Sequence, residues 1–169
     1  MCIKMTRNHR RVACVLLLLW LLAAIAMLFL GKPHPHYYDS YEQYLLANID
    51  LIPFQSTQNY IELLRLDKIE PDAVARNIAG NIVLFVPLGF LLPCLYKRFV
   101  NAKPIIISSV LLAFVFETIQ LLTMCGCFDI DDIILRSTGT MIGLMLWKIS
   151  FIYSKSSASS NDSKTHITA

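Results

Sequence analysis

The sequence predicts an all-α membrane protein, a bundle of four transmembrane helices with a short amphipathic helix in a long outer loop. Of its 169 residues, 56% are hydrophobic and only 16% are charged, whereas a soluble domain carries about 25% charged residues. The apolar residues form long runs, and the basic residues flank those runs. These observations argue against a soluble domain, and the net charge of +3 is too small to indicate a nucleic-acid partner.

The first apolar run, Val12–Leu30, contains no charged residue. As a helix rising about 1.5 Å per residue it spans about 28 Å, close to the thickness of the hydrocarbon core. The run is longer than the core of a secretory signal peptide, and it ends in LFLGKPHP without a small-residue cleavage pattern. We therefore expect residues 12–30 to be a retained signal-anchor helix that follows a cytoplasmic N-terminus at residues 1–11.

Three further apolar runs predict the remaining transmembrane helices. They lie at about 78–96, 105–124 and 133–153. Between the first and second spans lies a long polar loop, residues 31–77, which opens with Pro33 and Pro35 and so cannot continue the first helix.

Two segments outside the spans have their own signatures. Within the long loop, NYIELLRL (59–66) has the apolar spacing of a short amphipathic helix on the membrane surface or on the bundle. The Ser-rich tail, residues 154–169, nearly lacks large apolar groups and is predicted to be disordered in the cytoplasm.

The distribution of Lys and Arg predicts the orientation. The segment before the first span and the loop KRFVNAK (97–103) carry basic residues and no acid, and the C-terminal flank is also basic. The loop at 125–132 has three Asp and no Lys or Arg, and the loop at 31–77 has four basic residues against seven acidic ones. Both termini are therefore expected in the cytoplasm, with loops 31–77 and 125–132 outside.

Polar side chains interrupt the predicted spans near their outer ends. Glu117 lies roughly 10 Å below the outer end of the third span, and Gln120 shares its face. A carboxyl group inside a membrane helix is costly and usually has a function. Gln120 and Asn81, each taken alone, are more typical of hydrogen bonds between helices.

Other residues have structural interpretations. Asn77 shares a face with Asn81 and suits a cap of the second span at least as well as a binding role. We expect Pro87 to kink that span and the glycines to allow close helix packing. The glycines in question are Gly80, Gly89 and the GxxxG pair Gly139 and Gly143.

The stretch FDIDDIILRSTG (128–139) places Asp129, Asp131 and Asp132 just before the fourth span. Carboxylates at this spacing suit Mg²⁺ or Ca²⁺, or acid–base work. They equally suit capping at a helix N-terminus, with Asp132 paired to Arg136 one turn later and the other two acids nearer water. Both interpretations remain open. The five cysteines predict neither a disulfide framework nor a zinc site, and no cofactor is expected.

Four blocks of this sequence resemble the VanZ-like family, in the family's order and spacing. They are NIDLIPF (48–54), NIVLFVPLGFLLP (81–93), FETIQ (116–120) and FDIDDIILRSTGTMIG (128–143). The resemblance covers about residues 45–147 and implies a small polytopic membrane protein of Gram-positive and related bacteria. It also implies a link to low-level teicoplanin resistance, which a member of the family confers. The positions that match the family's recurrent residues are Asn81, Pro87, Gly89, Glu117, Gln120, Asp129, Asp132 and Gly139.

One position departs from the family pattern. Relatives commonly carry Asn where this chain has Arg136, and the block before the acids, which often carries Arg in the family, reads CGC here (125–127). We hypothesise that the positive charge has moved from that loop to Arg136.

The resemblance and the polar residues support one main function. We expect a non-enzymatic protein of the cell envelope that binds a lipid, a lipid-linked cell-wall precursor or a glycopeptide in an outward-facing polar pocket, with the Tyr-rich segment 37–66 as its lid or rim. Such binding would contribute to teicoplanin resistance. The expected binding residues are Asn81, Glu117, Gln120, Asp129, Asp132 and Arg136.

Two alternatives stay open. The first is a membrane enzyme acting on a lipid headgroup, with Glu117 as acid or base and a metal held by Asp129 and Asp132. We favour binding because the chain has no nucleophile motif, no His in the bundle and few basic residues outside to hold a phosphate. The second is a transporter-like or scaffolding subunit that works only within a complex.

Overall fold

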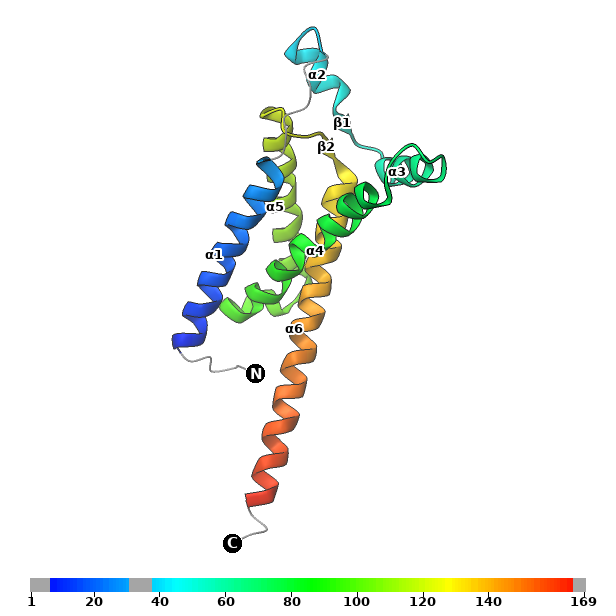
Figure 1. Cartoon of the computed structure of the whole chain (residues 1–169). Coiled ribbons are helices and arrows are strands. Elements are labelled where there is room, and N and C mark those ends of the chain that lie inside the picture. The colour runs from blue at the N-terminus through cyan, green and yellow to red at the C-terminus, as the bar shows by residue number, and fades with distance from the viewer. Residues whose placement is uncertain (1–6, 31–37, 166–169) are drawn as a thin grey trace.

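The computed structural model describes residues 7–30 and 38–165, with side chains described as far as Tyr153. The fold is all-α apart from one pair of very short strands (Figure 1). Along the chain the elements are α1 (Arg7–Phe29), α2 (Tyr41–Ala47), β1 (Ile49–Asp50), α3 (Gln55–Arg65), α4 (Pro71–Leu95), a 3₁₀ helix (Lys97–Val100), α5 (Ala102–Leu122), β2 (Phe128–Asp129) and α6 (Ile130–Thr165).

Three helices in the described part of the chain are long and apolar enough to cross a membrane: α1, α4 and α5. They coincide with the first three predicted spans. The fourth predicted span lies within α6, whose apolar run is diluted by Arg136, Lys148 and several hydroxyl residues, so its crossing stays a prediction. The signal-anchor character of α1 also stays a prediction. Pro33 and Pro35, which were predicted to end the first helix, lie outside the described residues.

Helix α4 begins earlier than the sequence predicted. Its first residue is Pro71, whose fixed φ angle suits the first turn of a helix. Asn77 is therefore inside α4, and the prediction that it caps the helix is wrong. Its main-chain carbonyl instead accepts a hydrogen bond from the side-chain amide of Asn81 (2.9 Å). Pro87 is accommodated within this one continuous helix.

At the other end of the chain, α6 continues to Thr165, into the segment whose composition predicts disorder. The stretch 154–165 contains neither Gly nor Pro. Because these two residues are the strongest helix breakers, nothing in the sequence ends the helix at Tyr153.

Glycines bring α4 and α6 into direct backbone contact. A Cβ atom on Gly143 would lie 2.0 Å from the carbonyl oxygen of Val86, and one on Gly139 would lie 2.0 Å from that of Ile82. From the α4 side, a Cβ on Gly89 would lie 1.9 Å from the carbonyl oxygen of Thr140. The predicted close packing is confirmed at these three glycines. It is wrong for Gly80, where a Cβ would meet nothing within 4 Å.

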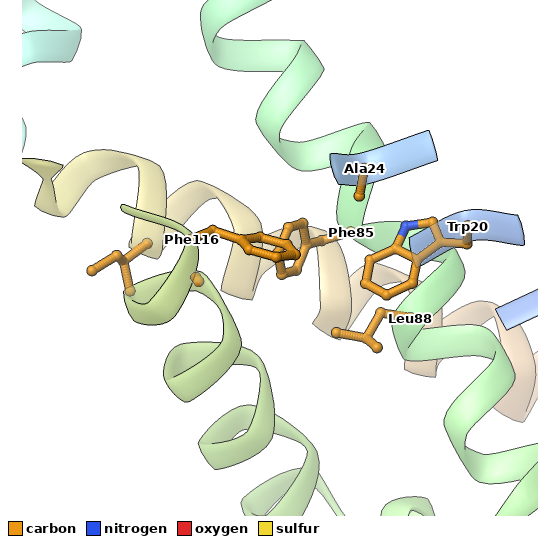
Figure 2. Packing of buried hydrophobic residues seen from close by; sticks show 7 residues of the cluster. Trp20, Ala24, Phe85, Leu88 and Phe116 are labelled. Atoms are coloured by element: carbon orange, nitrogen blue, oxygen red, sulfur yellow. The ribbon is translucent and has the colours of Figure 1, made fainter. Parts of the chain in front are cut away.

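An aromatic cluster fills the interior between these helices and α1 and α5 (Figure 2). The ring of Phe85 on α4 lies edge-on to Trp20 of α1, with centroids 5.7 Å apart, and to Phe116 of α5, with centroids 6.2 Å apart. The indole N–H of Trp20 donates to the main-chain carbonyl of Leu84 (2.5 Å), which satisfies its polar atom within the apolar interior.

The two predicted outer loops meet at one end of the bundle, which we call the loop end. Strands β1 and β2 pair in parallel there, with Ile49 opposite Phe128 and Asp50 opposite Asp129. The start of α1 and the end of α6 lie at the opposite end (Figure 1). Buried Tyr44 on α2 adds a further link, because its hydroxyl donates to the carbonyl of Gly126 (2.6 Å).

Candidate functional site

Arg136 lies at the centre of a buried polar network near the loop end. It is on the second turn of α6 and is 1% exposed. Its guanidinium group contacts three side chains from three helices. One terminal nitrogen lies 2.6 Å from Oε1 of Glu117 on α5, the other lies 3.3 Å from Oδ2 of Asp132 on α6, and Nε donates to Oδ1 of Asn81 on α4 (2.9 Å).

Asn81 of α4 bonds both Asp132 and Arg136 of α6. Besides accepting from Arg136, it donates from Nδ2 to Oδ1 of Asp132 (2.7 Å). The ring of Phe85, one turn further along α4, lies beneath the guanidinium group, with its centroid 5.8 Å from the central carbon. Phe85 therefore covers the cation with an aromatic face that attracts positive charge.

Glu117 connects this network to the second loop. The residue is fully buried, and its second oxygen, Oε2, accepts the backbone N–H of Asp129 (2.9 Å). Both carboxylate oxygens are therefore engaged, one by a cation and one by a peptide group. The single cation Arg136 faces two carboxylates, so the network carries excess negative charge whenever both are ionised.

Asp129 lies on β2 at the loop end, opposite Asp50 of β1. It is half-buried and accepts the N–H of Asp131 (2.8 Å). Burial is the main cause that raises the pKa of Asp129 above its usual value, and Asp131 and Asp50 add to it. Tyr60 of α3 borders the same region. Burial raises the pKa of its phenol, and the nearby charges of Asp132 and Asp129 raise it further.

Gln120 does not join the network. Its side-chain amide donates to the main-chain carbonyl of Leu28 on α1 (3.0 Å). It thus makes the hydrogen bond between helices that its residue type suggested. Its predicted role as a binding residue stays a prediction.

Asp131 is the residue that the sequence interpretation misplaced most. It was expected near water, yet it is 3% exposed. Its two carboxylate oxygens accept the backbone N–H groups of Phe54 and of Thr57 (2.9 Å), at the start of α3. Asp131 therefore does cap a helix N-terminus, as the DIDD pattern suggested, but the helix is α3 and not its own. No local pattern reveals this, since the partners are more than seventy residues away.

Two buried hydroxyl groups were also missed. Ser109 of α5 and Thr140 of α6 are both fully buried, and their oxygens are 2.7 Å apart. Within the described residues, no group of three or more His, Cys, Asp or Glu side chains is placed to hold a metal ion. Asp132 is occupied by Asn81 and Arg136, so the proposed metal pair with Asp129 gains no support from the geometry.

The fold and the network define a small helical membrane protein with a buried cluster of charged residues at the loop end of its bundle. The profile of the VanZ/LLP1 family matches residues 16–152, and the chain belongs to that family. It is 28% identical over 107 residues to Protein VanZ of Enterococcus faecium. That match covers 63% of this chain and 56% of the relative, so the chain spans a little over half of the relative's length. No solved structure matches this chain.

Proposed function

We propose that this chain is a VanZ-like protein of the bacterial cytoplasmic membrane that binds a lipid or lipid-linked cell-wall component at its loop end. Binding there would lower susceptibility to teicoplanin. The observation that carries the proposal is the convergence of Asn81, Glu117, Asp132 and Arg136 from three helices into one buried network. The proposed orientation has four crossings, with both termini in the cytoplasm and the loop end outside. The pairing of the two acid-rich loops at one end supports this orientation.

The physical cost of the network supports a role in binding. A buried ion pair is rarely more stable than apolar residues of the same volume, and charged side chains within membrane helices usually line a functional site. The glycine contacts and the aromatic cluster already hold the helices together. The network therefore adds charged side chains to an interior that these contacts already pack closely.

The charge of the site indicates the kind of group it would bind. The half-buried edge of the network, at Asp129 and Tyr60, carries acidic groups and no cation to hold a phosphate. Such an edge favours a headgroup that donates hydrogen bonds, such as sugar hydroxyls, peptide N–H groups or an ammonium. A lipid-linked muropeptide offers all of these next to an acyl-like tail that the bilayer would hold.

Binding to the purified chain tests the proposal. The full chain in lipid nanodiscs is titrated with a lipid-linked muropeptide and, in a second series, with teicoplanin. Glu117→Gln keeps the shape of the side chain but removes the charge that pairs with Arg136, and Glu62→Gln on the exposed face of α3 is the matched control. We expect Glu117→Gln to weaken binding about tenfold or more, because losing its ion pair with Arg136 would let the network shift, and about 1.4 kcal/mol of binding free energy corresponds to a factor of ten.

The control variant should bind as the wild type does. If neither ligand binds the wild type, or if Glu117→Gln binds as tightly as Glu62→Gln, the proposed binding role is wrong. A scaffolding role would then fit the chain better.

A further inference from the structure

The segment Leu51–Phe54, between β1 and α3, exposes an unusual set of apolar side chains. Leu51 is 60% exposed, Ile52 62% and Phe54 54%. The segment lies outside the three helices that can cross a membrane, and no charged residue occurs between Asp50 and Glu62. A polar loop facing water would not be expected to expose three large apolar side chains within four residues.

The N–H groups from Ile52 to Gln55 are bonded within the protein. The N–H of Ile52 donates to Oδ1 of Asp50 (3.1 Å), and the N–H of Gln55 donates to the carbonyl of Ile52 (3.2 Å). Pro53 has no N–H, and that of Phe54 donates to Asp131. Backbone that enters lipid must have its polar groups satisfied internally, and every N–H from Ile52 to Gln55 meets that condition.

The position of the segment relative to the bundle also favours contact with lipid. The strand β2, which pairs with β1, lies beside α5 and not above it. The ring of Phe128 packs edge-on against that of Phe114 of α5, with centroids 5.5 Å apart, and the backbone N–H of Asp129 donates to the carboxylate of Glu117. Glu117 precedes the end of α5 at Leu122 by about 7 Å of helix. Figure 1 shows α3 beside the first turns of α4 and α6.

The side chain of Asp131, on α6, fixes the conformation of the segment. Phe54 adopts a left-handed backbone conformation, with φ of 67°, which is unfavourable for a residue other than glycine. The two oxygens of Asp131 bond the backbone on either side of the first turn of α3, at Phe54 and Thr57. Asp131 thus holds the exposed apolar residues at a fixed place beside α6.

We propose that Leu51, Ile52 and Phe54 insert into the acyl-chain boundary of the leaflet at the loop end, and that Asp131 holds the segment in the shape that allows insertion. The partner is the lipid of the membrane that the bundle itself occupies. This anchor would fix α3, and with it Tyr60, at the level of the polar network. The proposal does not depend on which ligand that network binds.

Fluorescence quenching in vesicles tests the insertion. The full chain carrying Phe54→Trp is reconstituted in phosphatidylcholine vesicles, and the signal of the wild type, which contains Trp20 and Trp147, is subtracted. Glu42→Trp, at an exposed position on α2, is the matched control. We expect the added tryptophan at 54 to be quenched several-fold more by lipids brominated on their acyl chains than the one at 42, and correspondingly less by aqueous acrylamide.

If the tryptophan at 54 is quenched by acrylamide as strongly as the one at 42, the segment faces water and the proposal is overturned. That result would indicate a surface for another protein. Adding Asp131→Ala to Phe54→Trp should reduce acyl-chain quenching and increase acrylamide quenching. If quenching stays unchanged in this double variant, Asp131 does not hold the segment and that part of the proposal fails.

Discussion

Arg136 is a full positive charge at a position that is 1% exposed. Such a charge is tolerated only when its partners surround it closely, and Glu117, Asp132 and Asn81 do so from three helices. The sequence alone predicted the pair with Asp132, since i and i+4 share a helix face. It could not predict the pair with Glu117, because that contact depends on how α5 and α6 are aligned.

Arg136→Gln should destabilise the protein strongly. It would leave the carboxylates of Glu117 and Asp132 buried without their cation, and losing one partner of a buried pair costs about 3–5 kcal/mol. The free energy of unfolding in detergent micelles measures this loss. Arg76→Gln is the matched control: Arg76 pairs with Asp72 at the surface, and exposed pairs of this kind contribute about 0.5 kcal/mol or less.

A double-mutant cycle measures the interaction free energy between Arg136 and Glu117 apart from their other contacts. Because Glu117→Gln removes one of the stranded charges, Arg136→Gln with Glu117→Gln should cost less than the sum of the two single losses, by about 0.5–3 kcal/mol. Strict additivity would show that the two side chains do not interact.

The raised pKa of Asp129 predicts that the stability of the protein depends on pH. Burial raises its pKa in the folded state above the value in the unfolded chain, so the folded state binds the proton more tightly. The resulting cost to stability is absent below the unfolded pKa of about 4 and develops as the pH rises through the raised pKa. Asp129→Asn should therefore be more stable than the wild type at neutral pH, and this difference should vanish below about pH 4. Unfolding midpoints measured across that range test it, and a difference that grows on acidification would contradict it.

The contact between α4 and α6 is the interaction between elements that the sequence predicted best. GxxxG spacing indicated close packing, and Gly139 and Gly143 contact the α4 backbone directly. The close-packing prediction was wrong for Gly80, where a Cβ would meet nothing within 4 Å. The strands β1 and β2 were not predicted. Each has only two residues, and the partners are far apart in the sequence.

Alanine substitutions distinguish these glycines. Gly143→Ala would bring a methyl group to 2.0 Å from a backbone oxygen, so α4 and α6 must separate, at a cost of about 1–3 kcal/mol. Gly80→Ala meets open space and should stabilise the helix by up to about 1 kcal/mol. Thermal unfolding of both variants measures the contrast. Equal effects of the two substitutions would mean that the close contact does not exist.

For the whole molecule, hydropathy and charge predicted the three long apolar helices and placed both acid-rich loops on one side. The structure brings those two loops together through β1 and β2. It also shows why the predicted binding residues divide into two groups. Asn81, Glu117, Asp132 and Arg136 meet between α4, α5 and α6, whereas Gln120 bonds α1 and the carboxylate of Asp129 accepts the N–H of Asp131. This division follows from helix rotation, which spacing along one chain segment cannot specify.

We propose that the network around Arg136 is the functional site of this VanZ-like protein. The most direct test is the teicoplanin susceptibility of a sensitive Gram-positive host that expresses the wild type, Glu117→Gln or Glu62→Gln at equal membrane levels. We expect the wild type and Glu62→Gln to raise the inhibitory concentration by the same factor, and Glu117→Gln to leave the host as sensitive as it is without the protein. Full protection by Glu117→Gln would contradict the claim.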